Sequence, residues 1–387
     1  MPESTHSLAA YRCHFQAAYL YPPYQVLAVT RQRFYDAGHV EMYPTEVCEG
    51  VDDTPRQARR HRRIGMLSRR EVLIAAGAAS AAEVLRPWTT VLASASQPGT
   101  PVKFEVPAGT CDCHVHVFGD PRRFPFSPSR TYTPEPASVE ELRALHRALH
   151  LERVVVVNPS VYGTDNSCTL DAVKQLGSSA RAIAVIDDKI PGAAIDDMDR
   201  AGVRGIRINL ETSGQADPAV ARQSFKAGVE SIKGRKNWHI QVYARLSVIE
   251  ATADLIAAAP MPVVLDHFGG AKAALGVAQP GFETLLKLLR SGTAYVKISG
   301  AYRSSTLAPD YPDVAPLAKA LIAENRKRIL WGTDWPHPSQ VPDRKTEISP
   351  LFQIDDGRLF NQLAAWAPEA ATRASILVEN PARLYGF

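Results

Sequence analysis

Apolar and polar positions follow two alternating patterns from residue 111 onward. Short runs rich in apolar and β-branched residues predict eight buried strands, at residues 111–116, 153–158, 182–187, 205–210, 240–244, 262–267, 294–299 and 329–333. Between them apolar residues recur with helical period, as at 139–150, 196–201, 248–259, 282–289 and 316–324. Eight strand–helix repeats predict an α/β protein built as a closed (β/α)8 barrel, because right-handed crossovers let the eighth strand pair with the first. A Rossmann sheet is the rival, but no Gly-x-Gly-x-x-Gly follows an early strand.

The first hundred residues follow neither pattern. Residues 1–65 mix aromatic, proline and charged residues without a recognisable motif, so we interpret them as an extension. Residues 66–96 contain an Arg-Arg pair, a run of small apolar residues and an Ala-x-Ala-like end, which together resemble a twin-arginine export signal. We therefore predict a periplasmic protein cleaved near Ala95, with its barrel domain at 107–387. The alternative is an amphipathic helix in a cytoplasmic protein, and the charge of Glu83 argues against a membrane span.

Composition is that of a soluble globular protein. Of the 387 residues, 45% are hydrophobic, which suffices to fill the core of one large barrel. The net charge of +4 is small for this length, so we expect a small-molecule partner and no nucleic acid. The 5 cysteines follow no metal-finger spacing. Strand alternation places Cys111 and Cys113 opposite the neighbouring histidines, where we expect them to pack against helices.

Chemically active side chains stand at the predicted strand ends, where a barrel of this kind carries its active site. By alternation, Asp112, His114 and His116 share one face of the first strand. His267 ends the sixth strand and Asp334 follows the eighth. Further polar side chains at the same rim are Tyr132, Ser160, Arg207, Tyr243 and Arg303. Singly, a strand-end His usually bonds a loop carbonyl and an Arg usually pairs with a carboxylate, but their convergence favours a hydrolytic site.

Several motifs carry a family resemblance. They are Asp112-Cys-His-Val-His116, Phe124-Pro-Phe-Ser-Pro128, Arg204-Gly-Ile-Arg207, Trp331-Gly-Thr-Asp-Trp-Pro-His-Pro338 and Asn380-Pro-Ala-Arg-Leu-Tyr385. In this order they resemble the amidohydrolase superfamily, and within it the 2-pyrone-4,6-dicarboxylate lactonase family. The resemblance covers residues 107–387. It implies a (β/α)8 barrel and a lactonase that works without a metal.

The residues at the fourth and fifth strand ends bear on metal use. The resemblance implies that mononuclear superfamily members need a histidine at the fifth strand, where this chain has Tyr243. His239 lies four residues earlier, about 13 Å down the barrel at ~3.3 Å per residue. Arg207 stands where a carboxylated lysine would hold a second ion, and it would repel a dication. We therefore expect no cofactor, with a zinc site formed by His114, His116, His267 and Asp334 as the alternative.

These residues suggest a mechanism. We expect Asp334 to activate water as general base while His114, His116 and His267 donate hydrogen bonds to the oxyanion. Arg207 and Arg303 would bind a substrate carboxylate, with Tyr132, Ser160 and Tyr243 completing its hydrogen bonds.

Three departures from the lactonase family limit the substrate. Ser213 and Gly270 stand where the family has arginines, and Ser339 stands where it has Asn. We therefore expect a lactone with fewer acidic groups, such as a mono-acid or sugar-acid lactone, and an isomerase-like rearrangement stays open. A zinc-dependent hydrolase or decarboxylase also stays open, as does an exported binding protein without activity.

Overall fold

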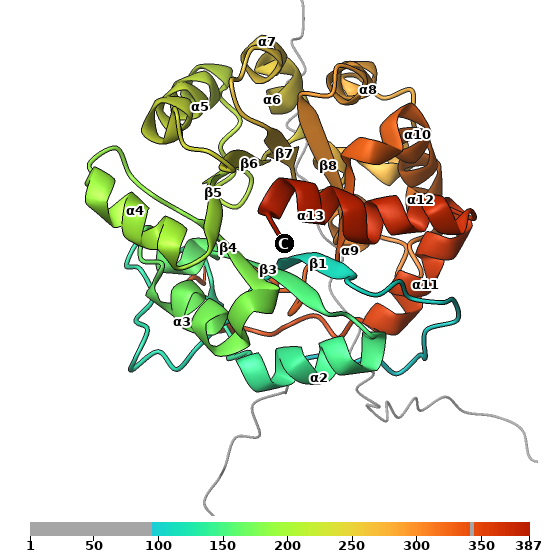
Figure 1. The fold of residues 1–387 in the computed structure, drawn as a ribbon, viewed down its shortest axis with the longest axis horizontal. Coiled ribbons are helices and arrows are strands. Elements are labelled where there is room, and N and C mark those ends of the chain that lie inside the picture. Colours follow the sequence, from blue (N-terminus) through green and yellow to red (C-terminus); the bar gives the residue numbers. More distant parts are fainter. Residues whose placement is uncertain (1–94, 341–343) are drawn as a thin grey trace, which may run out of the picture. The chain divides into compact units, whose positions relative to one another are not determined.

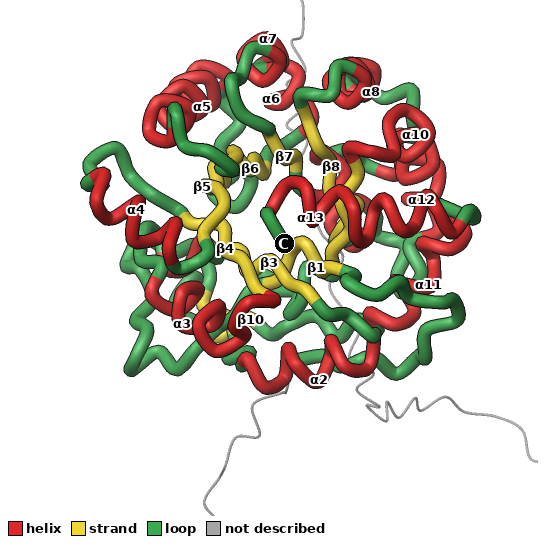
Figure 2. The backbone as a smooth tube through the Cα atoms, viewed as in Figure 1, coloured by secondary structure: helices red, strands yellow, loops and turns green. Residues whose placement is uncertain are grey.

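Eight parallel strands form a ring at the centre of the protein (Figure 2). The computed structural model describes residues 95–340 and 344–387. The strands pair in sequence order and are β1 (Cys111–Val115), β3 (Arg153–Val157), β4 (Ala180–Ala184), β5 (Val203–Asn209), β6 (His239–Tyr243), β7 (Val263–Leu265), β8 (Ala294–Ser299) and β9 (Ile329–Gly332). A parallel bridge between Val115 and Trp335 joins the last strand to the first. The predicted closed (β/α)8 barrel is therefore confirmed.

Helices surround the ring on its outer side (Figure 1). The longer ones are α2 (Val139–Leu149), α3 (Ser167–Leu176), α4 (Gly192–Arg200), α5 (Pro218–Ile232), α8 (Phe282–Arg290), α10 (Ala315–Asn325) and α11 (Asp356–Trp366). The shorter ones are α6 (Leu246–Ala251), α7 (Ala253–Ala257), α9 (Ala301–Ser304), α12 (Ala370–Ala374) and, over one end of the ring, α13 (Asn380–Tyr385). The local sequence explains where several of these helices begin. Ser138 and Glu141 form a capping box at α2, and Asp217 caps α5 just before a proline at its first position.

A β-bulge in β1 changes the faces that simple alternation predicts. The register of β1 against β3 shifts between Asp112 and Val115, so the inward and outward positions exchange within the strand. Cys111 and Cys113 lie in a buried cluster with side chains of the other strands, such as Val155, and with Tyr385 of α13. They therefore pack against α13 and not, as expected, against helices on the outer face of the strands. Asp112 does not share a face with His114. It points outward, 3.5 Å from His146 of α2.

The C-terminal segment covers the end of the barrel where the strands begin. In Figure 1 the chain end lies over the centre of the ring, beside α13. The side-chain amide of Asn380 donates to the carbonyls of Arg326 and Ile329, both at 2.8 Å, and anchors α13 beneath β9. The Tyr385 ring packs on the His239 ring at a centroid distance of 5.3 Å. His239 therefore lies at the end opposite the C-terminal strand ends, as predicted.

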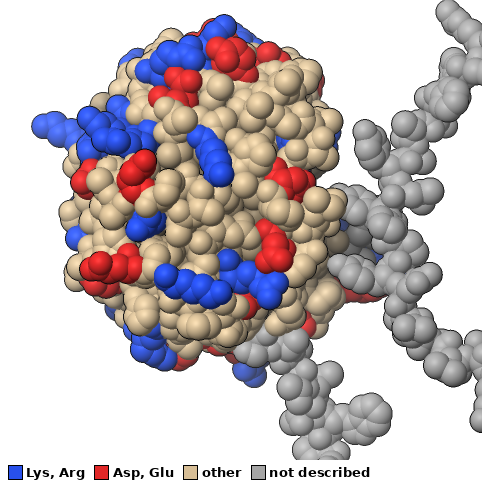
Figure 3. Space-filling view, turned by 90° about the vertical axis from the view of Figure 1, so that its right-hand side faces the viewer, with Lys and Arg blue, Asp and Glu red and all other residues tan. Residues whose placement is uncertain are grey.

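Basic and acidic side chains are interspersed over the face shown in Figure 3. Within residues 95–340 and 344–387, no helix combines the length and apolar character needed to cross a membrane. The predicted extension at 1–65 and export signal at 66–96 lie outside the described residues, apart from Ala95 and Ser96. Ser96 already belongs to the barrel, because its carbonyl accepts a 3.0 Å hydrogen bond from the Trp335 indole.

Candidate active site

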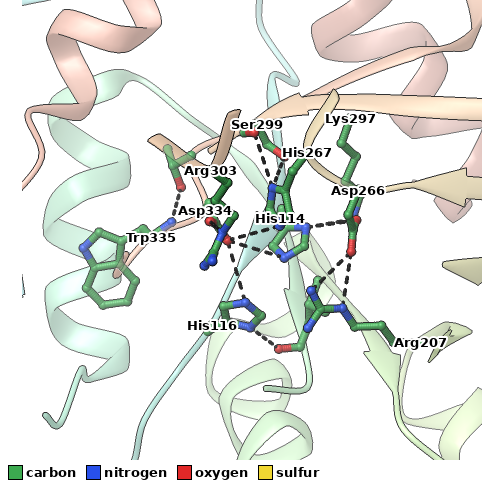
Figure 4. A network of polar contacts seen from close by, with 12 residues as sticks. His114, His116, Arg207, Asp266, His267, Lys297, Ser299, Arg303, Asp334 and Trp335 are labelled. Atoms are coloured by element: carbon green, nitrogen blue, oxygen red, sulfur yellow. Dashed lines mark hydrogen bonds and ion pairs between the residues drawn. The ribbon is translucent and has the colours of Figure 1, made fainter. Parts of the chain in front are cut away.

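Three imidazoles surround one oxygen of Asp334 at the C-terminal ends of the strands (Figure 4). The Asp334 Oδ1 atom lies 3.6 Å from His114 Nε2, 3.8 Å from His116 Nε2 and 3.8 Å from His267 Nε2. All four side chains are almost fully buried. The structure thus brings together all four residues that the sequence singled out for catalysis, and we refer to them as the histidine–aspartate cage.

Backbone geometry fixes the cage. Asp334 and His267 have φ angles of 67° and 49°, a left-handed conformation that is unfavourable for these residues and is typical of functional sites. The Asp334 backbone N–H donates to the His114 carbonyl at 2.9 Å. One residue earlier, Thr333 donates its N–H and hydroxyl to the carboxylate of Asp112, at 3.0 and 2.7 Å. Asp112 therefore supports the Asp334 turn from behind and takes no direct part in the cage.

The second oxygen of Asp334 is held by α9. Arg303 Nε donates to Asp334 Oδ2 at 2.5 Å, and the Tyr302 hydroxyl donates to the same atom at 2.7 Å. Burial alone would raise the pKa of Asp334, but Arg303 and the surrounding histidines together outweigh burial and hold that pKa well below its usual value. Asp334 is therefore ionised at neutral pH, and only Oδ1 faces the cage.

The three imidazoles are neutral, because burial lowers the pKa of His114 well below its usual value, that of His116 to about 3 and that of His267 to about 4. His116 Nδ1 lies 2.7 Å from the Val157 carbonyl, which can only accept. The ring hydrogen of neutral His116 therefore sits on Nδ1, and its Nε2 lone pair faces Asp334. His267 Nδ1 contacts the Ser299 carbonyl at 3.3 Å and hydroxyl at 3.0 Å, and the carbonyl favours the same tautomer.

The residues expected to bind substrate lie together around the mouth of the cage. His116, Tyr132, Ser160, Arg207, Tyr243 and Arg303 line one cavity, with Pro159, Asn209, Thr212, Pro338 and Gln340. The cavity volume of about 30 Å³ is enough for water and too small for a lactone ring. A ring-sized ligand therefore requires side chains at this mouth to move. Arg303 is suited to this, because its side chain is 20% exposed and its Nη groups make no hydrogen bond within the described residues.

Beneath the cage lies a buried charged network that sequence reasoning missed. Its members are Gln241 of β6, Asp266 after β7 and Lys297 of β8, all fully buried. Arg207 contacts Asp266 Oδ2 through Nε and Nη2, both at 3.3 Å, so its predicted role as a free carboxylate clamp is reduced by this partner. Side-chain alternation along the strands could have revealed two of these residues. Gln241 lies two residues before Tyr243, and Lys297 lies two residues before Ser299, so each shares a strand face with a residue near the site.

Part of the cage has the spacing of a metal site, because ligand atoms of His114, His116 and Asp334 all lie within 4.8 Å of one another. The atoms His114 Nε2, His267 Nε2 and Asp334 Oδ1 are buried and have no hydrogen-bond partner among the described residues. Bond lengths of ~2.1 Å in a tetrahedral zinc site place ligands about 3.4 Å apart, close to the 3.6 and 3.8 Å found here. His116, His267 and Asp334 offer lone pairs, and His114 would be the fourth ligand if its Nε2 carried no hydrogen. The Tyr243 ring packs against His267 at a centroid distance of 4.8 Å, so the end of β6 offers the cage a phenol and no imidazole.

A (β/α)8 barrel that gathers three histidines and an aspartate at its C-terminal strand ends defines an amidohydrolase-type protein. The family pattern described as amidohydrolase matches residues 111–387, so the chain belongs to the amidohydrolase family. It is 36% identical to a 4-sulfomuconolactone hydrolase of Hydrogenophaga intermedia, over 74% of this chain and 91% of that protein. It is 35% identical to a 2-pyrone-4,6-dicarboxylate hydrolase of Comamonas testosteroni, over 77% of this chain and 95% of that protein. A solved Agrobacterium tumefaciens structure matches with a TM-score of 0.62 and 26% identity, over 75% of this chain and 98% of that one.

Proposed function

We propose that this protein is a hydrolase that opens the ring of a small lactone bearing an acidic group. The observation that carries the proposal is an ionised carboxylate, Asp334, that faces three neutral imidazoles below a mouth lined by two guanidinium groups. The two relatives are named as hydrolases of a muconolactone and of a pyrone dicarboxylate, and both are more than 30% identical to this chain, which supports the same reaction type.

Water activation falls to Asp334. A water molecule above the cage can donate one hydrogen to Asp334 Oδ1 and the other to the Nε2 lone pair of His116 or His267. As the water oxygen bonds to the acyl carbon of the ring, its proton passes to Asp334. The acyl carbon–ring oxygen bond then breaks, and Asp334 returns the proton to the leaving alkoxide or enolate. One water is consumed, and the product is the open hydroxy or oxo acid.

The oxyanion formed on addition needs hydrogen-bond donors. The Nδ1 contacts of His116 and His267 favour Nε2 atoms without hydrogen, so of the three expected donors we assign this role to His114. Lys297 Nζ lies 3.2 Å from His114 Nδ1 and donates to it, which leaves the hydrogen of neutral His114 on Nε2. A donor placed in such a buried site typically lowers the reaction barrier by ~3–4 kcal/mol.

The cavity mouth favours a substrate with one acidic group next to the ring. Arg303 offers its Nη groups, and the Tyr132 and Ser160 hydroxyls lie beside it. The positions at which the lactonase family has further arginines contribute no cation. Ser213 bonds the Leu210 carbonyl at 3.1 Å. A side chain at Gly270 would place its Cβ 2.3 Å from the Ala244 carbonyl, so the backbone would have to shift.

We propose that hydrolysis proceeds without a metal. Two features support this: the phenol of Tyr243 at the strand end where the family resemblance implies a histidine ligand, and the Lys297 contact that favours hydrogen on His114 Nε2. The zinc alternative is supported by the spacing of the cage, and a bound ion would polarise the acyl oxygen and acidify water. Metal analysis of purified protein, with activity measured before and after chelation, separates the two. We expect activity to survive chelation; loss on chelation and return with zinc would establish the alternative.

A panel of lactones and their open acids tests the function itself. Acidic and neutral γ- and δ-lactones are incubated with protein in weak buffer containing a pH indicator. We expect proton release from acidic lactones, because ring opening creates a new carboxylic acid, and slower release from neutral ones. Binding of the open acid without proton release on any lactone would favour a binding protein. Carbon dioxide release from the acids would favour a decarboxylase, and a rearranged lactone would favour an isomerase.

We also propose export through the twin-arginine pathway. The pair Arg69–Arg70 and the small apolar run after it are the supporting features. Replacing both arginines with lysine should leave the protein in the cytoplasmic fraction of the producing cells, while the parent sequence reaches the periplasm. If the parent protein and the lysine variant are both found in the cytoplasmic fraction, a cytoplasmic protein is favoured.

A further inference from the structure

The Nδ1 atom of His114 lies between a hydrogen-bond donor and a hydrogen-bond acceptor. Lys297 Nζ is 3.2 Å from it, and Asp266 Oδ1 is 3.3 Å from it. Figure 4 shows both side chains approaching the imidazole from the side away from Asp334. All three side chains have no exposed surface, so water cannot replace either contact.

One ring nitrogen cannot use both neighbours at once. If Nδ1 accepts from Lys297, the hydrogen of neutral His114 is on Nε2 and points at Asp334. If Nδ1 donates to Asp266, Nε2 carries a lone pair instead. The first tautomer supplies an oxyanion donor, and the second supplies a metal ligand supported by a carboxylate, as is usual for metal-bound histidines. The two differ only in where one hydrogen sits, so the net charge of the site is unchanged.

Gln241 holds the donor and the acceptor in place. Its amide oxygen accepts from Lys297 Nζ at 2.7 Å, and its amide nitrogen donates to Asp266 Oδ2 at 2.9 Å. Arg207 binds the same Asp266 oxygen, so Oδ1 is left facing Lys297 and His114. Asp266 Oδ1 has no hydrogen bond of adequate geometry within the described residues, whereas the Lys297–His114 contact has one. The geometry of these contacts therefore favours the first tautomer, and Asp266 Oδ1 remains an acceptor for the second.

We infer that Lys297 and Asp266 are positioning residues that set the tautomer of His114, and with it whether the cage works as a metal-free oxyanion site or binds a divalent ion. This inference rests on the proposed function, in which the hydrogen on His114 Nε2 serves as the donor to the oxyanion. Lys297 favours the metal-free state, and Asp266 permits the metal-bound one. Replacing Lys297 should therefore raise metal affinity, and replacing Asp266 should lower it.

The tautomer can be read directly in the unmodified protein. Protein labelled with nitrogen-15 histidine and depleted of metal is examined by long-range proton–nitrogen NMR, with His114 assigned by its loss in His114→Asn. We expect hydrogen on Nε2 of His114 in metal-depleted protein and on Nδ1 after zinc is added. Hydrogen on Nδ1 in the metal-depleted protein would overturn the inference.

Metal affinity of variants gives the second test, measured by competition with a chromophoric chelator. Lys297→Met should raise zinc affinity by about tenfold or more, and Asp266→Asn should lower it by a similar factor, the range seen for residues behind metal ligands. Arg207→Met is the matched control, because it removes a buried positive charge bound to Asp266 and leaves the Nδ1 contacts intact. If Arg207→Met raises affinity as much as Lys297→Met, charge alone explains the effect and the inference fails.

Failure of the inference and failure of the proposed function are distinguishable. The NMR and affinity measurements need no substrate, so they stay decisive if no lactone is hydrolysed. Conversely, lactone hydrolysis with hydrogen fixed on His114 Nδ1 in metal-depleted protein would keep the function and reject the switch. The wild-type NMR experiment also decides the matter if Lys297→Met does not fold.

Discussion

Replacing Asp334 with asparagine removes the charge of the proposed base and keeps its shape. The amide oxygen can still accept from Arg303 Nε and the Tyr302 hydroxyl at Oδ2, which hold the carboxylate now at 2.5 and 2.7 Å. The amide nitrogen would occupy the Oδ1 position, where it cannot take a proton from water. The change thus tests the base and leaves the cage largely assembled.

The expected magnitude follows from the role. A positioned general base contributes about 10²–10⁴-fold to a rate, which is ~2.7–5.5 kcal/mol of barrier at ~1.4 kcal/mol per factor of ten. KM for an acidic lactone should change little or fall, because the charge that competes for Arg303 is gone. Stability should also fall, since Arg303 loses its ionic partner, but by less than the ~3–5 kcal/mol typical of a buried pair, because this side chain is 20% exposed.

The assay is initial-rate kinetics of ring opening, with thermal unfolding as a check that Asp334→Asn is folded. Tyr302→Phe is the matched control, because it removes one hydrogen bond to the same carboxylate and keeps the base. We expect less than a tenfold loss of kcat for the control. A folded Asp334→Asn protein with kcat within tenfold of the parent would refute Asp334 as the base.

Three further predictions concern the surroundings of the cage. Gly300→Ala should reduce kcat strongly and lower stability by about 1 kcal/mol or more. The reason is that φ of Gly300 is 58° and the new Cβ would lie 2.8 Å from Asp334 Oδ2. Unchanged kinetics would show that α9 can shift freely. Arg303→Met should raise KM for an acidic lactone by roughly 10–100-fold, the worth of one charge-assisted hydrogen bond, and should alter KM for a neutral lactone much less in the same assay. Burial lowers the pKa of His116 and His239 to about 3 and that of His267 to about 4, so below their unfolded pKa of about 6.5 the unfolded chain binds more protons. Thermal unfolding midpoints should therefore fall as pH drops from about 6.5 toward 4, and a flat profile over that window would contradict the buried neutral imidazoles.

Much of the fold and the meeting of the candidate catalytic residues at one rim could be predicted from the sequence, because both follow from local pattern. Each barrel strand is a short apolar run, and the residue after it lies at the C-terminal rim whatever its neighbours are. The positions of His267, Asp334 and Tyr243 at the rim were found in this way, as was the placement of His239 at the opposite end of the barrel. These predictions need no knowledge of register between strands.

What could not be predicted depends on departures from regular geometry and on pairing between distant strands. The bulge in β1 lets Cys113 and His114 both face inward, so alternation placed Asp112 on the wrong face. The network behind His114 joins β6, β7 and β8, and whether Lys297 meets Gln241 depends on the stagger of those strands in three dimensions. A single chain read residue by residue contains no information on that stagger.

Ring opening in water enriched with oxygen-18 tests the central claim most directly. Purified protein is incubated with a lactone that carries one carboxylate, and the product is analysed by mass spectrometry with fragmentation. Activation of water by Asp334 and attack at the acyl carbon predict an open acid with one oxygen-18, in the carboxyl group formed from the ring ester. Label on the alcohol oxygen, or a rearranged lactone without label, would contradict the account.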